Sequence, residues 1–290
     1  MTDFTEIADR VWVLRHPWLD LNVTAIAGDR GLVLVDPHGS RVAGEEVLDA
    51  LGRLASPDRR LVAAVNTHEH FDHTFGNGAV LARHPGVPVH ATDTAAARTR
   101  PAGERAKREH ADAAASGDAR AGEVVATDIV AADVTFSSAA VIDLDDRQVE
   151  LVHLGRGHTG GDLVVRVPDA DVVLAGDLLE ESAPPAYGDD SYPLEWASTL
   201  DLVLTLVTGG TVVVPGHGAL VDRGFVEQQC DDIRAVGEGI RELLHAGASV
   251  DDVVRRGTWP FPDDVVAAAV RAALLTSPQA RRRLPMAGDA

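Results

Sequence analysis

The run His68-Glu69-His70-Phe71-Asp72-His73 places more constraint on the fold than any other feature of this 290-residue chain. It follows the apolar run Leu61–Val65 almost directly, and a continuous apolar run of that length favours a strand buried on both faces. In layered α/β proteins the loops after such strands carry the ligand-binding residues, because the strand holds them rigidly. The sequence therefore predicts an α/β fold with a polar site at a strand end.

The spacing within this run indicates a metal site. His68 and His70 alternate on an extended segment and can face one way, while Asp72 and His73 follow where the chain turns into a helix. Burying three imidazoles and a carboxylate together is costly unless a cation binds them. Histidine and aspartate suit Zn²⁺ or a related first-row ion. The alternative is a solvated loop that happens to be rich in histidine.

Three later fragments repeat the order of strand, ligand-type residue and small residue. The sequence GRGHTGGD carries His158, LAGD ends on Asp177, and PGHG carries His217. Each follows or closes an apolar run that reads as a strand. These residues join the list of candidate metal ligands.

The remaining pattern predicts two strand-rich halves, each followed by helices. Strands are expected at Val11–Leu14, Val23–Ala27, Leu32–Val35, Leu61–Val65, Val149–Leu154, Leu163–Val167, Val172–Ala175 and Thr211–Val214. Helices are expected at Val42–Leu54, at Leu194–Val207 and throughout the stretch beyond Val221, with breaks at Gly247 and at residues 259–262. Two sheets packed face to face with helices outside would satisfy this order. The segment from Ala95 to about Ala132 reads as an exposed helical excursion or a lid over the site.

Composition narrows the classes of function. The chain has 26 basic and 45 acidic residues, a formal charge of −19 that would repel nucleic acid. We expect no membrane partner, since no window approaches the roughly 18 apolar residues of a membrane span. The first residues show no signal-peptide pattern, which predicts a cytoplasmic protein. The single cysteine, Cys230, cannot form an intramolecular disulfide and is expected to be a half-buried thiol.

The motifs HxHxDH, GHTxGD, AGD and PGHG, in this order, resemble those of the metallo-β-lactamase superfamily over about residues 10–220. The resemblance implies an αββα four-layer sandwich with the metal site at one edge of the sheets. It implies a single domain of residues 1–290, with the sandwich over about 8–220 and a helical C-terminal extension over about 221–290. It also implies that His68, His70 and His158 hold one metal, that Asp72, His73 and His217 hold a second, and that Asp177 bridges both.

By the same resemblance the cofactor is expected to be two Zn²⁺ ions, with iron or manganese as alternatives. Two such ions would lower the pKa of a bridging water and yield hydroxide as the nucleophile. Asp72 would orient this hydroxide and relay its proton. We therefore expect a dinuclear hydrolase that cleaves a small-molecule thioester, ester or lactone.

Several alternatives stay open. The β-lactamases of the family usually have cysteine or serine at the position of Asp177, so β-lactam hydrolysis is expected as a minor activity at most. The ligand set resembles that of glyoxalase II, but residues 222–290 show no obvious basic cluster for a glutathione carboxylate. A mononuclear iron enzyme such as a persulfide dioxygenase, or a metal-binding regulatory protein, would use similar residues. A homodimer is compatible with the helical tail.

Residues around the ligands are assigned on weaker signals. Asp36 resembles an aspartate that supports a ligand histidine in the family, although an Asp-Pro turn is an equal alternative. His38 could contact substrate or be exposed. The loop Glu180–Pro193 holds both tyrosines, Tyr187 and Tyr192, and is the expected substrate wall unless it is an ordinary surface loop. Glu69 is expected at the surface.

Overall fold

The computed structural model describes residues 3–54 and 60–277. The strands are β1 (Thr5–Ala8), β2 (Val11–His16), β3 (Leu21–Gly28), β4 (Gly31–Val35), β5 (Leu61–Val65), β6 (Val89–Thr92), β7 (Val134–Phe136), β8 (Ala139–Asp143), β9 (Gln148–Val152), β10 (Val164–Val167), β11 (Val172–Glu180) and β12 (Val212–His217). The helices are α1 (Arg41–Leu54), α2 (Phe71–Thr74), α3 (Asn77–Arg83), α4 (Asp93–Ala115), α5 (Ala119–Ala126), α6 (Trp196–Leu204), α7 (Arg223–His245), α8 (Val250–Arg256) and α9 (Asp263–Thr276), with a 3₁₀ turn at Pro168–Ala170.

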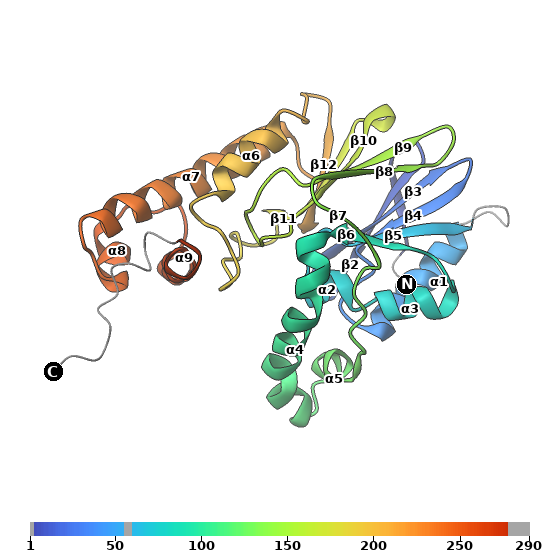
Figure 1. Cartoon of the computed structure of the whole chain (residues 1–290), viewed down its shortest axis with the longest axis horizontal. Helices are drawn as coiled ribbons and strands as arrows, with labels where there is room; N and C mark the ends of the chain where they lie inside the picture. Colours follow the sequence, from blue (N-terminus) through green and yellow to red (C-terminus); the bar gives the residue numbers. More distant parts are fainter. Residues whose placement is uncertain (1–2, 55–59, 278–290) are drawn as a thin grey trace.

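The strands form two halves that share one hydrogen-bonded path. The first half runs β7-β6-β5-β4-β3, with β2 and β1 added beside β3, and the second runs β12-β11-β10-β9-β8. Between β3 and β12 the pairing is a single residue pair, Leu21 with His217. The two halves therefore behave as two sheets hinged at this pair, and Figure 1 shows them facing each other.

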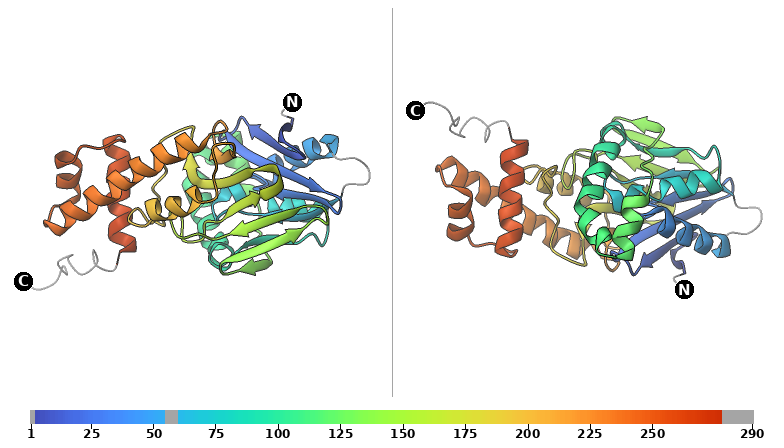
Figure 2. Two further views of the ribbon diagram at one scale, coloured as in Figure 1. Left: turned by 90° about the horizontal axis from the view of Figure 1, so that it is seen from above. Right: turned by 90° about the horizontal axis from the view of Figure 1, so that it is seen from below.

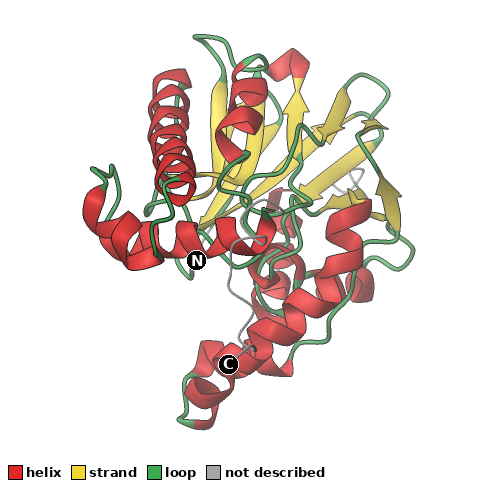
Figure 3. Cartoon of the chain, turned by 60° about the vertical axis from the view of Figure 1, so that its left-hand side comes forward, coloured by secondary structure: helices red, strands yellow, loops and turns green. Residues whose placement is uncertain are grey.

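Three separate hydrophobic layers fill the spaces between the elements. The layer between the sheets joins β4 and β5 residues such as Val33 and Val65 to β9 and β10 residues such as Leu151 and Val165. A second layer packs α1 and α3 against the first sheet. A third packs α6 and α7 against the second sheet. Helices lie outside both sheets (Figure 3), so the predicted αββα sandwich is confirmed.

The C-terminal helices extend from the second sheet. Helix α7 presents a buried stripe that includes Val226, Cys230 and Ile233, at the spacing of one helix face. Both α8 and α9 pack against α7. Figure 2 shows the resulting helical arm reaching beyond the sandwich, with α9 turned back toward it. The predicted breaks at Gly247 and at residues 259–262 separate these three helices.

Most predicted elements are present with small shifts of their bounds. Strand β5 is as predicted, and the excursion after Ala95 is helical as α4 and α5. Sequence reasoning missed β1, β6, β7 and β8, which have only three to five residues each. Within residues 3–54 and 60–277, no helix is both long and apolar enough to pass through a bilayer.

Candidate metal centre

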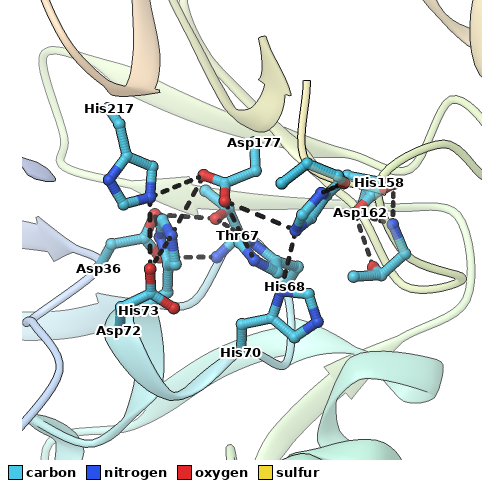
Figure 4. A network of polar contacts seen from close by, with 12 residues as sticks. Asp36, Thr67, His68, His70, Asp72, His73, His158, Asp162, Asp177 and His217 are labelled. Carbon is cyan, nitrogen blue, oxygen red and sulfur yellow. Dashed lines mark hydrogen bonds and ion pairs between the residues drawn. The ribbon is translucent and has the colours of Figure 1, made fainter. Parts of the chain in front are cut away.

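The seven predicted ligands come from the segment after β5, the loop between β9 and β10, strand β11 and the last residue of β12, which meet at one edge of the sandwich. Strand β5 ends at Val65, and α2 begins at Phe71 with His70 at its N-cap position. This abrupt change from strand to helix sends His68 and His70 one way and Asp72 and His73 another. Figure 4 shows the side chains converging on Asp177.

The ligand-type atoms fall into two clusters, in each of which they lie within 4.8 Å of one another. The first cluster consists of His68, His70 and His158, and the second of Asp72, His73, Asp177 and His217. Asp177 also faces the first cluster, since its Oδ2 lies 3.5 Å from Nε2 of His158 and 3.8 Å from Nε2 of His68. Its Oδ1 lies 3.2 Å from Nε2 of His73 and 3.4 Å from Nε2 of His217. One carboxylate thus spans both clusters.

Asp72 is the second carboxylate of the second cluster. Its Oδ2 lies 3.3 Å from Nε2 of His217 and 3.7 Å from Nε2 of His73. Gly216, the glycine before His217, makes room for the bridging carboxylate, because a Cβ there would collide with Oδ1 of Asp177. Packing against Asp177 therefore explains the glycine that precedes His217 in the PGHG motif.

Each of the five histidines is oriented by a partner on its other ring nitrogen. Nδ1 of His158 lies 3.1 Å from the carbonyl oxygen of Ala186, and Nδ1 of His217 lies 2.7 Å from that of Leu19. A carbonyl oxygen only accepts, so these Nδ1 atoms carry the proton and Nε2 keeps its lone pair. Metal-binding histidines are commonly oriented in this way.

The Asp36 carboxylate orients two more of the histidines. Its Oδ2 lies 2.9 Å from Nδ1 of His73 and accepts the Thr67 hydroxyl at 2.8 Å. Since the Thr67 proton is used there, its oxygen accepts from Nδ1 of His68 at 3.1 Å. Asp36 is therefore a structural partner of two candidate ligands, and the interpretation as a mere Asp-Pro turn is wrong.

The inward-facing atoms fit a metal. Nε2 of His68, Nε2 of His73 and Oδ1 of Asp177 are buried and have no hydrogen-bond partner in the described residues. Nε2 of His158 lies 2.8 Å from Nδ1 of His70. The other ring nitrogen of each histidine faces an oxygen that accepts its proton, so both of the facing nitrogens carry lone pairs. Converging lone pairs and orphaned buried atoms require a positive charge among them.

The two clusters differ in charge. Burial lowers the pKa of His68, and it lowers that of His158 to about 4, so both imidazoles are neutral ligands near pH 7. Burial also acts to lower the pKa of His217, but Asp177 and Asp72 outweigh it and raise that pKa to about 12. The negative potential of the second cluster thus favours a cation at this position.

A cavity of about 550 Å³ opens onto the clusters. Its floor includes His70, Asp72, His158, Asp177 and His217. Its sides come from α2, α4, the loop after β11 and α9, which supply Phe71, Ala102, Arg105, Ala106, Glu109, Ala186, Ala268 and Arg271. Helix α4 thus forms one wall of the cavity, as expected if the segment after Ala95 acts as a lid.

Two of the weaker assignments, those of His38 and Glu69, are wrong. His38 is fully buried and outside the cavity, where its ring stacks on Trp18 and its Nδ1 accepts from the Gly39 amide. Glu69 is buried rather than exposed, because α4 covers it and brings the Arg98 guanidinium to 2.9 Å.

The two tyrosines occupy different places. Tyr187 lines the cavity with its ring, which contacts Trp196 edge-on, while its hydroxyl is buried. Tyr192 does not line it, because the ring is held under the Arg156 guanidinium at 4.4 Å and faces a neighbouring cleft. The prediction of Tyr192 as a wall of the metal cavity is therefore wrong.

Sequence reasoning missed Asp190. Its Oδ2 lies 3.4 Å from Nε2 of His70 and accepts from the Arg105 guanidinium at 2.6 Å. The fifth ligand histidine is thus tied through Asp190 to α4. The only signal in the sequence was its place in the Glu180–Pro193 loop, which does not distinguish Asp190 from Asp189.

Comparison with known proteins agrees with this geometry. Residues 16–217 match the family described as the metallo-beta-lactamase superfamily, so the chain belongs to that superfamily, whose members are metal-dependent hydrolases. A metallo-beta-lactamase type 2 from Bacillus cereus is 26% identical over 204 residues, 70% of this chain and 68% of that protein. A hydroxyacylglutathione hydrolase from Gloeobacter violaceus is 43% identical over 63 residues, 22% of each chain.

Solved structures show the same fold. A metallo-beta-lactamase from Pontibacter korlensis superposes with a TM-score of 0.61 at 21% identity, covering 81% of this chain and 99% of that one. A stereoselective inverting sec-alkylsulfatase from a Pseudomonas species gives a TM-score of 0.75 at 18% identity. That superposition covers 99% of this chain and 51% of the sulfatase, so it includes the C-terminal helices.

Proposed function

We propose that this protein is a dinuclear metal-dependent hydrolase that cleaves a small-molecule thioester, ester or lactone. The observation that carries the proposal is the position of Asp177, whose two oxygens face two separate clusters of metal-ligand type. Seven donor residues exceed the four of a closed structural zinc site. A carboxylate that faces both clusters suits a pair of closely spaced ions.

Histidine and carboxylate donors favour two zinc ions, and iron or manganese would suit them too. Bound zinc ions supply Lewis acidity and make a nearby water acidic enough to react near neutral pH. In the protein, Asp72 lines the cavity with its side chain 14% exposed, so its carboxylate would be placed to orient that water and relay its proton. His70 and His158 hold the other side of the cavity floor.

The cavity supports a small substrate and a reaction without a protein nucleophile. Its volume of about 550 Å³ is in the range of small-molecule sites. Cys230 is buried under α6, where it contacts the carbonyl of Ala197, and Lys107 is not among the lining residues. Ser182 does line the cavity, but its hydroxyl donates a hydrogen bond to the Glu180 carboxylate. The stretch similar to hydroxyacylglutathione hydrolase favours a thioester within the proposed range.

Hydrolysis of chromogenic esters, thioesters and lactones by the zinc-loaded protein tests the proposal. We expect His70→Ala to lower kcat/KM by about 100-fold or more, because it removes a ligand at the cavity floor. His84→Ala, which changes a histidine outside the cavity, should be neutral. Equal rates for wild type and His70→Ala would contradict the proposal.

The alternatives predict other results in the same assays. An iron enzyme of the persulfide dioxygenase kind would hold one iron and consume oxygen, and a regulatory protein would bind metal without turnover. The panel should include a β-lactam and a secondary alkyl sulfate, since relatives and structural neighbours carry those names. Rapid cleavage of one of these, with slow cleavage of all thioesters, esters and lactones, would replace the proposed substrate class.

A further inference from the structure

The helical arm contributes a cation to the cavity. Ala268 and Arg271 of α9 line the same cavity as the metal clusters, although they lie more than fifty residues after His217 in the chain. They are three residues apart and therefore share one face of the helix. In Figure 1, α9 is seen end-on beside the loop that follows β11.

The position of this face is fixed by packing on the other side of α9. Val266, Ala269 and Val270 are buried in the hydrophobic layer that α7 also joins. One turn further on, Leu275 and Thr276 line the neighbouring cleft together with Asp189 and Asp190. Arg271 therefore extends from a rigidly packed helix toward the loop after β11.

Arg271 differs from the other cation of the cavity. The Arg105 guanidinium lies 2.6 Å from Asp190 and 3.9 Å from Glu109, so its charge is already balanced. Arg271 is exposed and forms no ion pair or hydrogen bond with any residue in the part of the chain that the structure describes. It is also the only basic residue of α9.

Most of the acidic residues that line the cavity already have a partner or a proposed role. They are Asp72, Glu109, Asp177, Glu180, Asp189 and Asp190. Asp72 and Asp177 are proposed metal ligands, Asp190 is paired with Arg105, and Glu180 accepts hydrogen bonds from the amide and hydroxyl of Ser182. A guanidinium that has no partner among the described residues, at the wall of a cavity in a chain of charge −19, is thus set up to bind an incoming anion.

The lining of the cavity also includes apolar side chains. Phe71, Ala102, Ala106, Ala186 and Ala268 line the cavity. We propose that the substrate carries a second, anionic group, a carboxylate or a phosphate, that binds Arg271 while the scissile group lies at the metal clusters. This inference rests on the proposed function, and it assigns Arg271 as a specificity-determining residue.

Matched esters test this proposal. The zinc-loaded protein would be assayed with p-nitrophenyl butyrate and with the mono-p-nitrophenyl esters of succinate, glutarate and adipate, which add a terminal carboxylate. We expect Arg271→Gln to raise KM about tenfold for at least one anionic ester and to leave butyrate unchanged, since one charge-assisted contact is lost. Arg271→Lys should keep part of the preference.

The control is Arg255→Gln, which removes an exposed arginine from α8, outside the cavity. It should change neither substrate class. If Arg271→Gln affects anionic and neutral esters equally, or affects neither, Arg271 does not bind an anionic group and the proposal is overturned.

Binding without turnover separates this proposal from the proposed function. Calorimetric titration of the metal-loaded protein would compare glutarate and 4-phosphonobutyrate with butyrate. Arg271→Gln should weaken the two probes that carry a second acidic group about tenfold and leave butyrate, whose single carboxylate is expected at the metal ions, nearly unchanged. The probe that Arg271→Gln weakens more indicates whether Arg271 prefers a carboxylate or a phosphonate. This contrast would persist even if no ester were hydrolysed, whereas its absence would overturn the role of Arg271 alone.

Discussion

Asp190 is the residue through which a helix outside the sandwich reaches a metal ligand. Its carboxylate contacts Nε2 of His70 and the Arg105 guanidinium of α4. We expect Asp190→Asn to weaken metal binding by 10- to 100-fold, as typical for the loss of such a partner. Competition with a chromogenic chelator measures the change. Asp189→Asn alters the exposed neighbour and should have little effect, and equal affinities for the two variants would contradict this role of Asp190.

Cys230 allows a test of burial at a single side chain. The residue is 1% exposed, and burial raises the pKa of its thiol to about 11. Because the pKa is raised, the native state favours the protonated thiol. This contribution to stability is complete below the unfolded-state pKa and is lost as pH rises through about 11.

At pH 8 only ~0.1% of the Cys230 thiol is ionised in the native state. Iodoacetamide should therefore label the protein far more slowly in buffer than in concentrated urea, with mass spectrometry as the readout. Similar labelling rates in the two solvents would show that the thiol is accessible.

Some properties of single residues follow from a sequence motif, whereas others depend on the fold. The ligand types and their order follow from chemistry within short stretches, so all seven could be selected from the sequence. The burial of Glu69 and the role of Asp190 depend on α4, which lies over both from another part of the chain. The hydrogen bonds of Asp36 likewise required the three-dimensional positions of Thr67 and His73.

At the scale of elements, the parallel pair β11 and β12 positions Asp177 and His217. The strands are in register from Val172 with Val212 to Leu174 with Val214, and the pairing shifts beyond that point. The backbone at Gly216 lies so close to Oδ1 of Asp177 that a Cβ atom would not fit there. The spacing of the second metal cluster therefore depends on this glycine.

Gly216→Ala should remove metal from the second cluster. The added methyl group collides with Oδ1 of Asp177, so we expect the metal content to fall by at least one equivalent per chain. Gly209→Ala is the matched control, since a Cβ there meets nothing within 4 Å. Full metal content in Gly216→Ala would contradict the proposed position of the second ion.

Element prediction succeeded where burial makes the pattern strong. Strand β5 is nearly all buried and β11 is buried along its length, whereas β8 alternates between exposed and half-buried residues. Short, partly exposed strands such as β7 carry little apolar signal and exist because neighbouring strands supply hydrogen bonds. The apolar run alone predicted that this strand ends at Ala175. Because β11 also pairs with β12 beyond that residue, the strand extends to Glu180.

For the whole molecule, the orphaned atoms of the clusters predict that metal stabilises the fold. Removing the ions leaves the lone pairs of the neutral His68 and His158 facing one another without a cation, and only protonated histidines to balance the two carboxylates. At free metal 1,000 times Kd, binding contributes about 4 kcal/mol, which corresponds to a Tm shift of about 10 °C for a chain of this size. Calorimetry before and after chelation measures it. An unchanged Tm after verified metal loss would contradict the prediction.

The family and the four layers were predictable because they follow from the joint order of motifs and strands. The position of α9 was not, since the arm returns to the cavity only through packing among α7, α8 and α9. Arg271 gives no signal in the sequence, where it is one basic residue in an alanine-rich helix. The substrate preference proposed here therefore depends on tertiary structure rather than on a motif.

We propose that two metal ions lie on either side of Asp177. Elemental analysis by mass spectrometry of protein purified without added metal tests it most directly. We predict close to two equivalents of zinc per chain, falling to one or less in Asp177→Ala because both clusters share that carboxylate. One equivalent of iron, or no bound metal in wild type, would contradict the account.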